Sequence, residues 1–170
     1  TVRSIPASRF VRVPRGVSEA GVSPLAVAVF AVLEARHGPG TRSVTMPQAQ
    51  IMTELGRRGR RPDRVRAAVT ELVDAGVLRV WRARVDAEHT YELLVRGGRE
   101  SAWDQLSMQL MAAMAAGECS PTELVGALVV DRALGRRGWT ADSFEELGQR
   151  MGCSARSMRR HVERLVAVAC

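Results

Sequence analysis

The sequence has no lysine and no asparagine, and all 25 of its basic side chains are arginine. Lysine and asparagine codons are AT-rich, so their absence indicates a GC-rich bacterial genome, and we expect an actinobacterial source. Genome composition does not explain the excess of base over acid, which gives the 170-residue chain a net charge of +7. A basic charge of this size favours a polyanionic partner, most often nucleic acid.

Long apolar runs are also missing. No window approaches the 18 consecutive apolar residues of a membrane-spanning helix, so we expect no membrane partner. Residues 1–15 carry arginines with no apolar run behind them, which excludes a secretory signal. The chain begins at Thr1, so we expect it to be processed or cut from a longer one. Three widely spaced cysteines, Cys119, Cys153 and Cys170, favour free thiols in a reducing cytosol.

Motifs typical of enzymes and metal sites do not occur. The sequence has no glycine-rich phosphate loop and no nucleophile motif. Cys153 and His161 are eight residues apart, with no further ligand to complete a zinc site. We therefore expect no enzyme activity, no cofactor and no metal. His161, near the apolar side of the last expected helix, is interpreted as a packing residue.

The sequence pattern predicts a mainly helical chain with one β-hairpin. Serine followed by proline at Ser23 and Ser120 predicts helix starts, as does capping-box spacing at Thr45 and Ser143. After Gly76 the period changes to two, which predicts strands over 77–82 and 90–95. The expected helices cover residues 24–37, 46–55, 62–74, 101–116, 121–134, 144–151 and 155–166.

Two segments repeat one design. Each has a supporting helix, a short helix, a turn with glycine, and a helix with apolar residues on one side and arginines on the other. When Gly56 is aligned with Gly152, Ile51 falls on Leu147. Glycine suits such a turn because it adopts the left-handed conformation without strain. The repeat predicts two helix-turn-helix units.

These residues also resemble a known family. The stretch 65–78, VRAAVTELVDAGVL, resembles the recognition helix of a bacterial winged-helix domain and the start of its wing. The stretch 146–165, ELGQRMGCSARSMRRHVERL, resembles the short helix, turn and recognition helix of the same family. The resemblance implies three parts: a basic arm over 1–22, a winged-helix domain over 23–96 with its wing hairpin at 78–95, and a second helix-turn-helix domain over 97–170.

The sequence departs from the family pattern in two places. The turn after Gly56 is about three residues longer than the turn after Gly152 and is loaded with arginine. The chain ends at Cys170, where a second wing is expected to begin, so that wing is absent or truncated. Tandem chains of this kind occur among transcription regulators and among plasmid replication initiators.

The arginines gather on the two expected recognition elements. Residues 57–66 carry a net charge of +5 and residues 150–164 a net charge of +4, which leaves the other 145 residues at −2. We expect base contacts from Arg64, Arg66, Arg156, Ser157 and Arg160. We expect phosphate contacts from Arg57, Arg58, Arg60, Arg61, Ser154, Arg159, Arg84 and His89. The competing interpretation of such arginines is a solvated helix face.

The stripe Trp103, Leu106, Leu110 and Met114 has two interpretations, an interdomain core or a dimer helix that makes a homodimer. The function we expect is sequence-specific binding of double-stranded DNA, most simply by a transcription regulator that is cytoplasmic and associated with the nucleoid. The alternatives are a plasmid or phage replication initiator, a centromere-type DNA-binding protein, and a winged-helix protein-interaction adaptor in chromosome maintenance. The sequence names no small-molecule effector.

Overall fold

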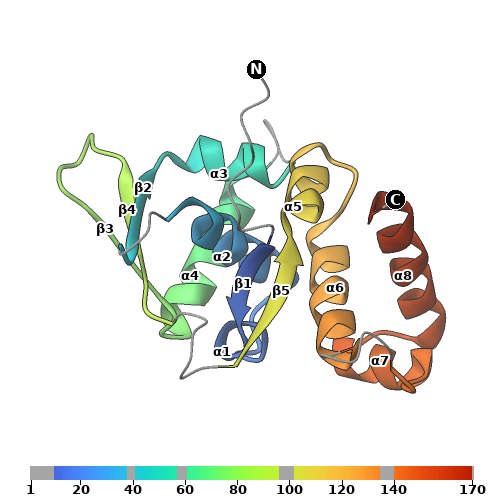
Figure 1. The fold of residues 1–170 in the computed structure, drawn as a ribbon. Coiled ribbons are helices and arrows are strands. Elements are labelled where there is room, and N and C mark those ends of the chain that lie inside the picture. Colours follow the sequence, from blue (N-terminus) through green and yellow to red (C-terminus); the bar gives the residue numbers. More distant parts are fainter. Residues whose placement is uncertain (1–9, 38–40, 57–60, 96–101, 135–139, 170) are drawn as a thin grey trace.

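The computed structural model describes residues 10–37, 41–56, 61–95, 102–134 and 140–169. In these ranges the chain forms eight helices and two small antiparallel sheets (Figure 1). The helices are α1 (Arg15–Ser18), α2 (Pro24–Arg36), α3 (Gln48–Glu54), α4 (Pro62–Asp74), α5 (Met108–Ala115), α6 (Pro121–Leu134), α7 (Phe144–Met151) and α8 (Ala155–Ala169). The strands are β1 (Phe10–Pro14), β2 (Ser43–Met46), β3 (Leu78–Arg82), β4 (His89–Leu93) and β5 (Trp103–Ser107). A helix-rich chain with a small β-hairpin is thus confirmed in outline, with more strands than expected.

The helix starts follow the capping signals in the sequence. The hydroxyl of Ser23 accepts the N–H of Ala26 at the start of α2, with proline in the first turn. Ser143 and Glu146 form a complete capping box at the start of α7. The predicted starts of these two helices are therefore confirmed.

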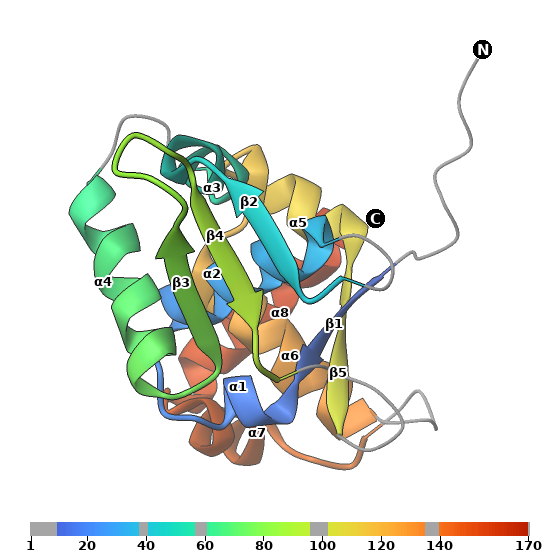
Figure 2. The same cartoon turned by 90° about the vertical axis from the view of Figure 1, so that its left-hand side faces the viewer.

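The predicted hairpin is confirmed, and it belongs to a three-stranded sheet. The strand order is β2–β4–β3, and Figure 2 shows this sheet with α4 beside its β3 edge. β2 was not predicted. Thr45, expected as a helix cap, lies in β2, and its hydroxyl pairs with that of Thr90 on β4 at 2.8 Å. The cap position of α3 is held by Pro47.

The second sheet is a two-stranded ribbon of β1 and β5, in which Arg12 lies opposite Gln105. Residues 10–18, expected as part of a basic arm, instead form β1 and α1. Val11 and Val13 point into the core, while Arg12 between them lies over the rings of Phe10 and Trp103. The ribbon therefore joins the start of the chain to a strand from its second half.

The single helix predicted over residues 101–116 is wrong, and so is the proposed dimer helix. Trp103 and Leu106 lie on β5, whereas Leu110 and Met114 lie on α5. Leu106 and Met114 are fully buried in the core, and Leu110 packs against it. Because these side chains do not share a helix face, they cannot form the expected dimer stripe.

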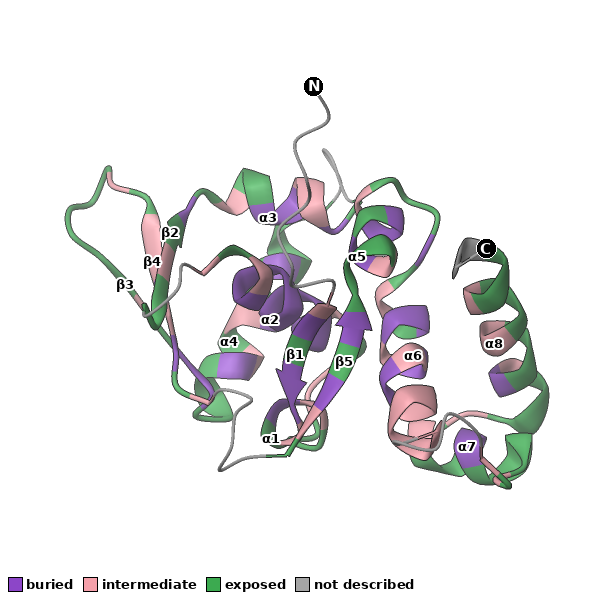
Figure 3. Ribbon diagram, in the orientation of Figure 1, coloured by how far each residue is buried: buried purple, intermediate pink, exposed green. Residues whose placement is uncertain are grey.

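One hydrophobic core joins the described parts of both halves of the chain. At its centre lies α2, whose residues Ala26–Glu34 are all buried (Figure 3). α2 contacts α4 on one side and α6 on the other, and it also packs on β1. The expected domain boundary at residues 96 and 97 lies outside the described residues.

A buried ion cluster reinforces the ribbon. Asp104 on β5 is 1% exposed and accepts hydrogen bonds from Arg15 on α1 and Arg132 on α6 at 3.1 and 3.2 Å. The Arg132 guanidinium also pairs with Glu19 at 2.7 Å. The hydrogen bond to Asp104 raises the pKa of Arg132, so this guanidinium keeps its charge at any physiological pH.

Candidate nucleic-acid interface

Helix α4 has an apolar face against the core and an arginine face toward solvent. Arg64 and Arg66 are both exposed, and neither pairs with a carboxylate among the described residues. Proline at the first helical position, Pro62, needs no N–H partner there, and Arg61 before it has a left-handed φ of 51°. The buried residues of α4 are Val65, Ala68 and Leu72.

Polar contacts at both ends fix α4. Glu71 accepts hydrogen bonds from the N–H of Ser23 at 2.7 Å and from its hydroxyl at 3.0 Å, which fastens α4 to the start of α2. At the other end, the side chain of Gln48 donates to the Pro62 carbonyl at 2.9 Å and accepts from Arg66 Nε at 3.3 Å. The terminal guanidinium nitrogens of Arg66 remain available for a ligand.

The β3–β4 hairpin is close to charge balance. Residues 79–92 contain three arginines and three acids. Arg79 pairs with Glu92 across the strands at 3.0 Å. Arg82 donates to His89 at 2.6 Å and to the carbonyl of Val85 at 3.1 Å. The exposed hairpin cation without such a partner is Arg84, in the connection between the strands.

His89 is neutral at physiological pH. Burial, followed by the positive charges of Arg82 and Arg66, lowers the pKa of His89 below its ordinary value of 6.5. Its ring therefore adds no positive charge, and one ring nitrogen already accepts from Arg82. Any phosphate contact by His89 must come from the N–H of the other ring nitrogen. Figure 2 shows the tip of the β3–β4 hairpin near the start of α4.

Helix α8 repeats the division of faces seen in α4. Met158 is fully buried, whereas Arg156 and Arg160, one helical turn apart, are exposed. Neither of these two arginines pairs with a carboxylate in the described part of the chain. Arg159 pairs with Glu163 at 3.0 Å, on a surface where both are largely exposed. Such an exposed pair contributes little to stability.

Two polar residues at the start of α8 have structural roles. The Ser154 hydroxyl accepts the N–H of Ser157 at 3.2 Å, and the two hydroxyls lie 3.1 Å apart. Ser157 is thus engaged in the helix cap, which limits its reach toward a base edge. Arg164, farther along, turns inward and pairs with the buried Glu123 of α6 at 2.9 Å.

The predicted site residues fall into two separate groups. Arg61, Arg64 and Arg66 share the α4 surface, with the hairpin beside them. Arg156, Arg159 and Arg160 lie on α8, on the far side of the β1–β5 ribbon from α4 (Figure 1). Arg57, Arg58 and Arg60 lie outside the described residues. Sequence reasoning missed Gln48, because its role depends on the contact between α3 and α4.

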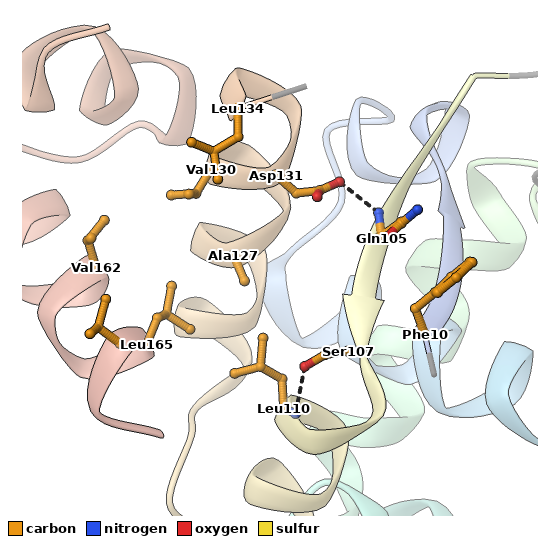
Figure 4. Close-up of a pocket in the computed structure, with 11 residues that line it drawn as sticks. Phe10, Gln105, Ser107, Leu110, Ala127, Val130, Asp131, Leu134, Val162 and Leu165 are labelled. Atoms are coloured by element: carbon orange, nitrogen blue, oxygen red, sulfur yellow. Dashed lines mark hydrogen bonds between the residues drawn. The ribbon is translucent and has the colours of Figure 1, made fainter. Parts of the chain in front are cut away.

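An apolar cleft of about 460 Å³ lies beside α8 (Figure 4). Asp131 is the one ionisable side chain among the described residues that line it, and it accepts the backbone N–H of Gln105 at 2.9 Å. None of its described lining residues is an arginine, so it is separate from the basic surface formed by the described arginines. The apolar lining residues include Phe10, Leu110, Val162, Leu165 and Val166.

The described residues hold no group of three or more His, Cys, Asp or Glu side chains placed to bind a metal ion. Among the same residues, no helix is long and apolar enough to cross a bilayer. Comparisons with protein-family models, with curated proteins and with solved structures found no match.

Proposed function

We propose that the protein binds double-stranded DNA in a sequence-specific manner, through α4 with the β3–β4 hairpin and through α8. One observation carries the proposal. Each of these helices buries an apolar face and exposes arginines that no described carboxylate neutralises, Arg64 and Arg66 on α4 and Arg156 and Arg160 on α8. Solvated faces usually mix the two signs of charge, so unpaired arginines at two such places favour a polyanion.

The order of elements supports this interpretation. Helix α2, strand β2, helices α3 and α4, and strands β3 and β4 follow one another as in the winged-helix domain that the sequence resembles. In this interpretation α4 is the recognition helix and the hairpin is the wing. Helices α6, α7 and α8 resemble the helices of a helix-turn-helix unit, with α8 as its recognition helix.

The expected mechanism divides the arginines by role. An α-helix fits the major groove, where an arginine fork matches the O6 and N7 atoms of guanine. We expect Arg64 and Arg66, and on the other unit Arg156 and Arg160, to contact base edges. We expect Arg61, at the N-terminal edge of α4, to contact a phosphate, which sets affinity without reading sequence. The neutral His89 and the balanced hairpin make the wing the weaker contact.

Salt dependence of binding to a selected duplex tests the proposal. Fluorescence anisotropy is expected to give a log–log slope of roughly −0.9 per phosphate neutralised. A flat response would refute DNA binding and favour the protein-interaction adaptor. Arg12→Ala is the charge-matched control, because Arg12 lies on β1 over the ring of Trp103 and on neither proposed recognition helix. It is expected to leave affinity within about twofold, whereas Arg64→Ala is expected to lower it at least tenfold.

The biological role follows from where the sites lie. We propose a transcription regulator, for which genome-wide mapping is expected to place bound sites at promoters. A replication initiator would instead occupy repeated sites near an origin. Mapping the bound sites in the native genome therefore separates the two roles without further structural work.

A further inference from the structure

The two halves of the chain repeat one succession of elements. β1 leads directly into α1 and then to α2, α3 and α4, while β5 leads directly into α5 and then to α6, α7 and α8. Equivalent elements start at residues 10 and 103, at 24 and 121, and at 62 and 155, so their separations are 93, 97 and 93 residues. Among the described residues, only β2, β3 and β4 lack a counterpart. The repeat is therefore larger than the helix-turn-helix pattern visible in the sequence.

Residues at equivalent positions of the two halves also have the same structural roles. The hydroxyls of Ser23 and Ser120 both accept the N–H three residues on, at 3.3 and 3.2 Å. Left-handed glycines follow both short helices, Gly56 with φ 67° and Gly152 with φ 74°. The fourth residue of α4 and of α8, Val65 and Met158, is fully buried. The buried residues of α6, Glu123, Leu124, Gly126 and Leu128, occupy the helix positions of Ala26, Val27, Val29 and Ala31 on α2.

The β1–β5 ribbon fixes how the two repeats are related. An antiparallel strand pair has a local two-fold axis perpendicular to the ribbon, here near the facing residues Arg12 and Gln105. The attached helices follow the same rotation. α2 packs on β1 and α6 packs on β5, and α2 and α6 pack against each other. Figure 1 shows α1 and α5 at opposite ends of the ribbon, and α4 and α8 on opposite sides of it.

We infer that one chain reads a DNA site made of two half-sites in opposite orientation, one bound by α4 and the other by α8. This inference rests on the proposed function. Symmetric helix-turn-helix dimers match inverted half-sites because a two-fold axis relates their recognition helices. Here the approximate two-fold axis lies within a single chain, so a dimer is not needed to present two inverted surfaces.

The two half-sites differ in sequence. Counted from the start of each helix, the third position is Arg64 on α4 and Ser157 on α8. The sixth position is Ala67 on α4 and Arg160 on α8. The hairpin adds contacts on the α4 side, with no described counterpart beside α8. The site is therefore inverted in geometry and not a palindrome in sequence.

Hydroxyl-radical footprinting on a duplex selected from a random library tests the two-part site. The wild-type chain is expected to protect two separate blocks. The variant Arg64→Ala/Arg66→Ala is expected to lose protection in one block only, and Arg156→Ala/Arg160→Ala in the other block only. A single protected block that either double variant removes would overturn the inference.

Directed cleavage tests the orientation. An iron-chelate reagent is attached to a cysteine replacing either helix cap, Arg61→Cys or Ser154→Cys, in a chain whose native cysteines are replaced by serine or alanine. Equivalent caps related by a two-fold axis lie near opposite DNA strands, so the two reagents are expected to cut opposite strands. Cuts on the same strand would indicate direct half-sites and overturn the inference.

The number of chains bound to each duplex, and binding at low salt, distinguish failure of the two-part inverted site from failure of the proposed function. Mass photometry is expected to find one chain on each selected duplex, and two chains would overturn the inference in favour of an ordinary dimer. If no duplex is bound at low salt, the proposed function itself fails. If DNA is bound with one block or same-strand cuts, the proposed function stands and only the two-part inverted site is lost.

Discussion

The substitution Gly56→Ala is expected to loosen the contact between the turn after α3 and the turn after α5. Gly56 has a left-handed φ of 67°, and a Cβ built there would meet the carbonyl oxygen of Met114 and the backbone of Gly117. The approach to that oxygen is well inside 3.0 Å, a separation that real Cβ atoms essentially never show. Both neighbours are backbone atoms, so one turn must move away from the other.

The expected loss has two parts. Alanine in the left-handed region costs about 1 kcal/mol relative to glycine. Moving packed backbone apart adds about 2 kcal/mol, within the range seen for overpacked sites. We therefore expect Gly56→Ala to lower the free energy of unfolding by about 3 kcal/mol. Gly21, with φ 75°, and Gly117, with φ 80°, supply controls. Alanine at either position carries the cost of the left-handed backbone but no packing cost, because a Cβ there has no neighbour within 4 Å.

Equilibrium urea unfolding followed by far-UV circular dichroism measures these differences. Gly21→Ala and Gly117→Ala are each expected to lose about 1 kcal/mol, a third of the loss at Gly56. Gly117 is the sharper control, because it lies on the other side of the same contact. If all three variants lost equal free energy, the two turns would not be packed as closely as described.

Three further predictions concern other parts of the chain. Asp104→Asn is expected to lower the free energy of unfolding by about 2 kcal/mol, because two guanidiniums lose a buried charge partner. The control Glu92→Gln, at an exposed ion pair, is expected to lower it by under about 0.5 kcal/mol. Equal losses of the two variants in urea unfolding would contradict this prediction. Burial raises the pKa of Cys119 from 9.0 to about 11, so its thiolate is scarce in the folded state. Alkylation of this thiol at pH 8 is therefore expected to be roughly a hundredfold slower in the folded protein than in urea-unfolded protein. Equal alkylation rates, measured by mass spectrometry, would refute the burial of Cys119. Ser143→Ala removes the hydroxyl that accepts the N–H of Glu146, one of the two hydrogen bonds of the capping box, and is expected to cost about 1 kcal/mol. An unchanged unfolding midpoint would count against that cap.

Local signals predicted the elements that local chemistry determines. The bounds of α4 agree with the prediction over 62–74, because proline fixes its start and Gly76 follows its end. The hairpin strands were also visible, since their alternation needs no distant partner to be recognised. The arginine faces of α4 and α8 were predictable for the same reason, because helical periodicity alone places them opposite the buried residues.

Elements that depend on distant partners were missed. On β5 the inward positions are Asp104 and Leu106, and the inward aspartate hid the apolar alternation of a strand. Its burial is possible only because Arg15 and Arg132, far away in sequence, pair with it. β1 was read as an arm because its partner strand lies 93 residues away. Because the β1–β5 ribbon was not predicted, the approximate two-fold rotation that relates the arginines of α4 to those of α8 was not predicted either.

The β1–β5 ribbon has a consequence for how the chain folds during synthesis. Val11 and Val13 on β1 pair with Leu106 and Asp104, so this strand finds its partner only after most of the chain exists. Pairing over such a sequence separation closes a long loop and slows folding. We expect the first helices to emerge from the ribosome as a loose assembly with an uncovered apolar strand. A nascent chain is therefore expected to become resistant to protease only after β5 and α6, which packs on both β5 and α2, have left the ribosome.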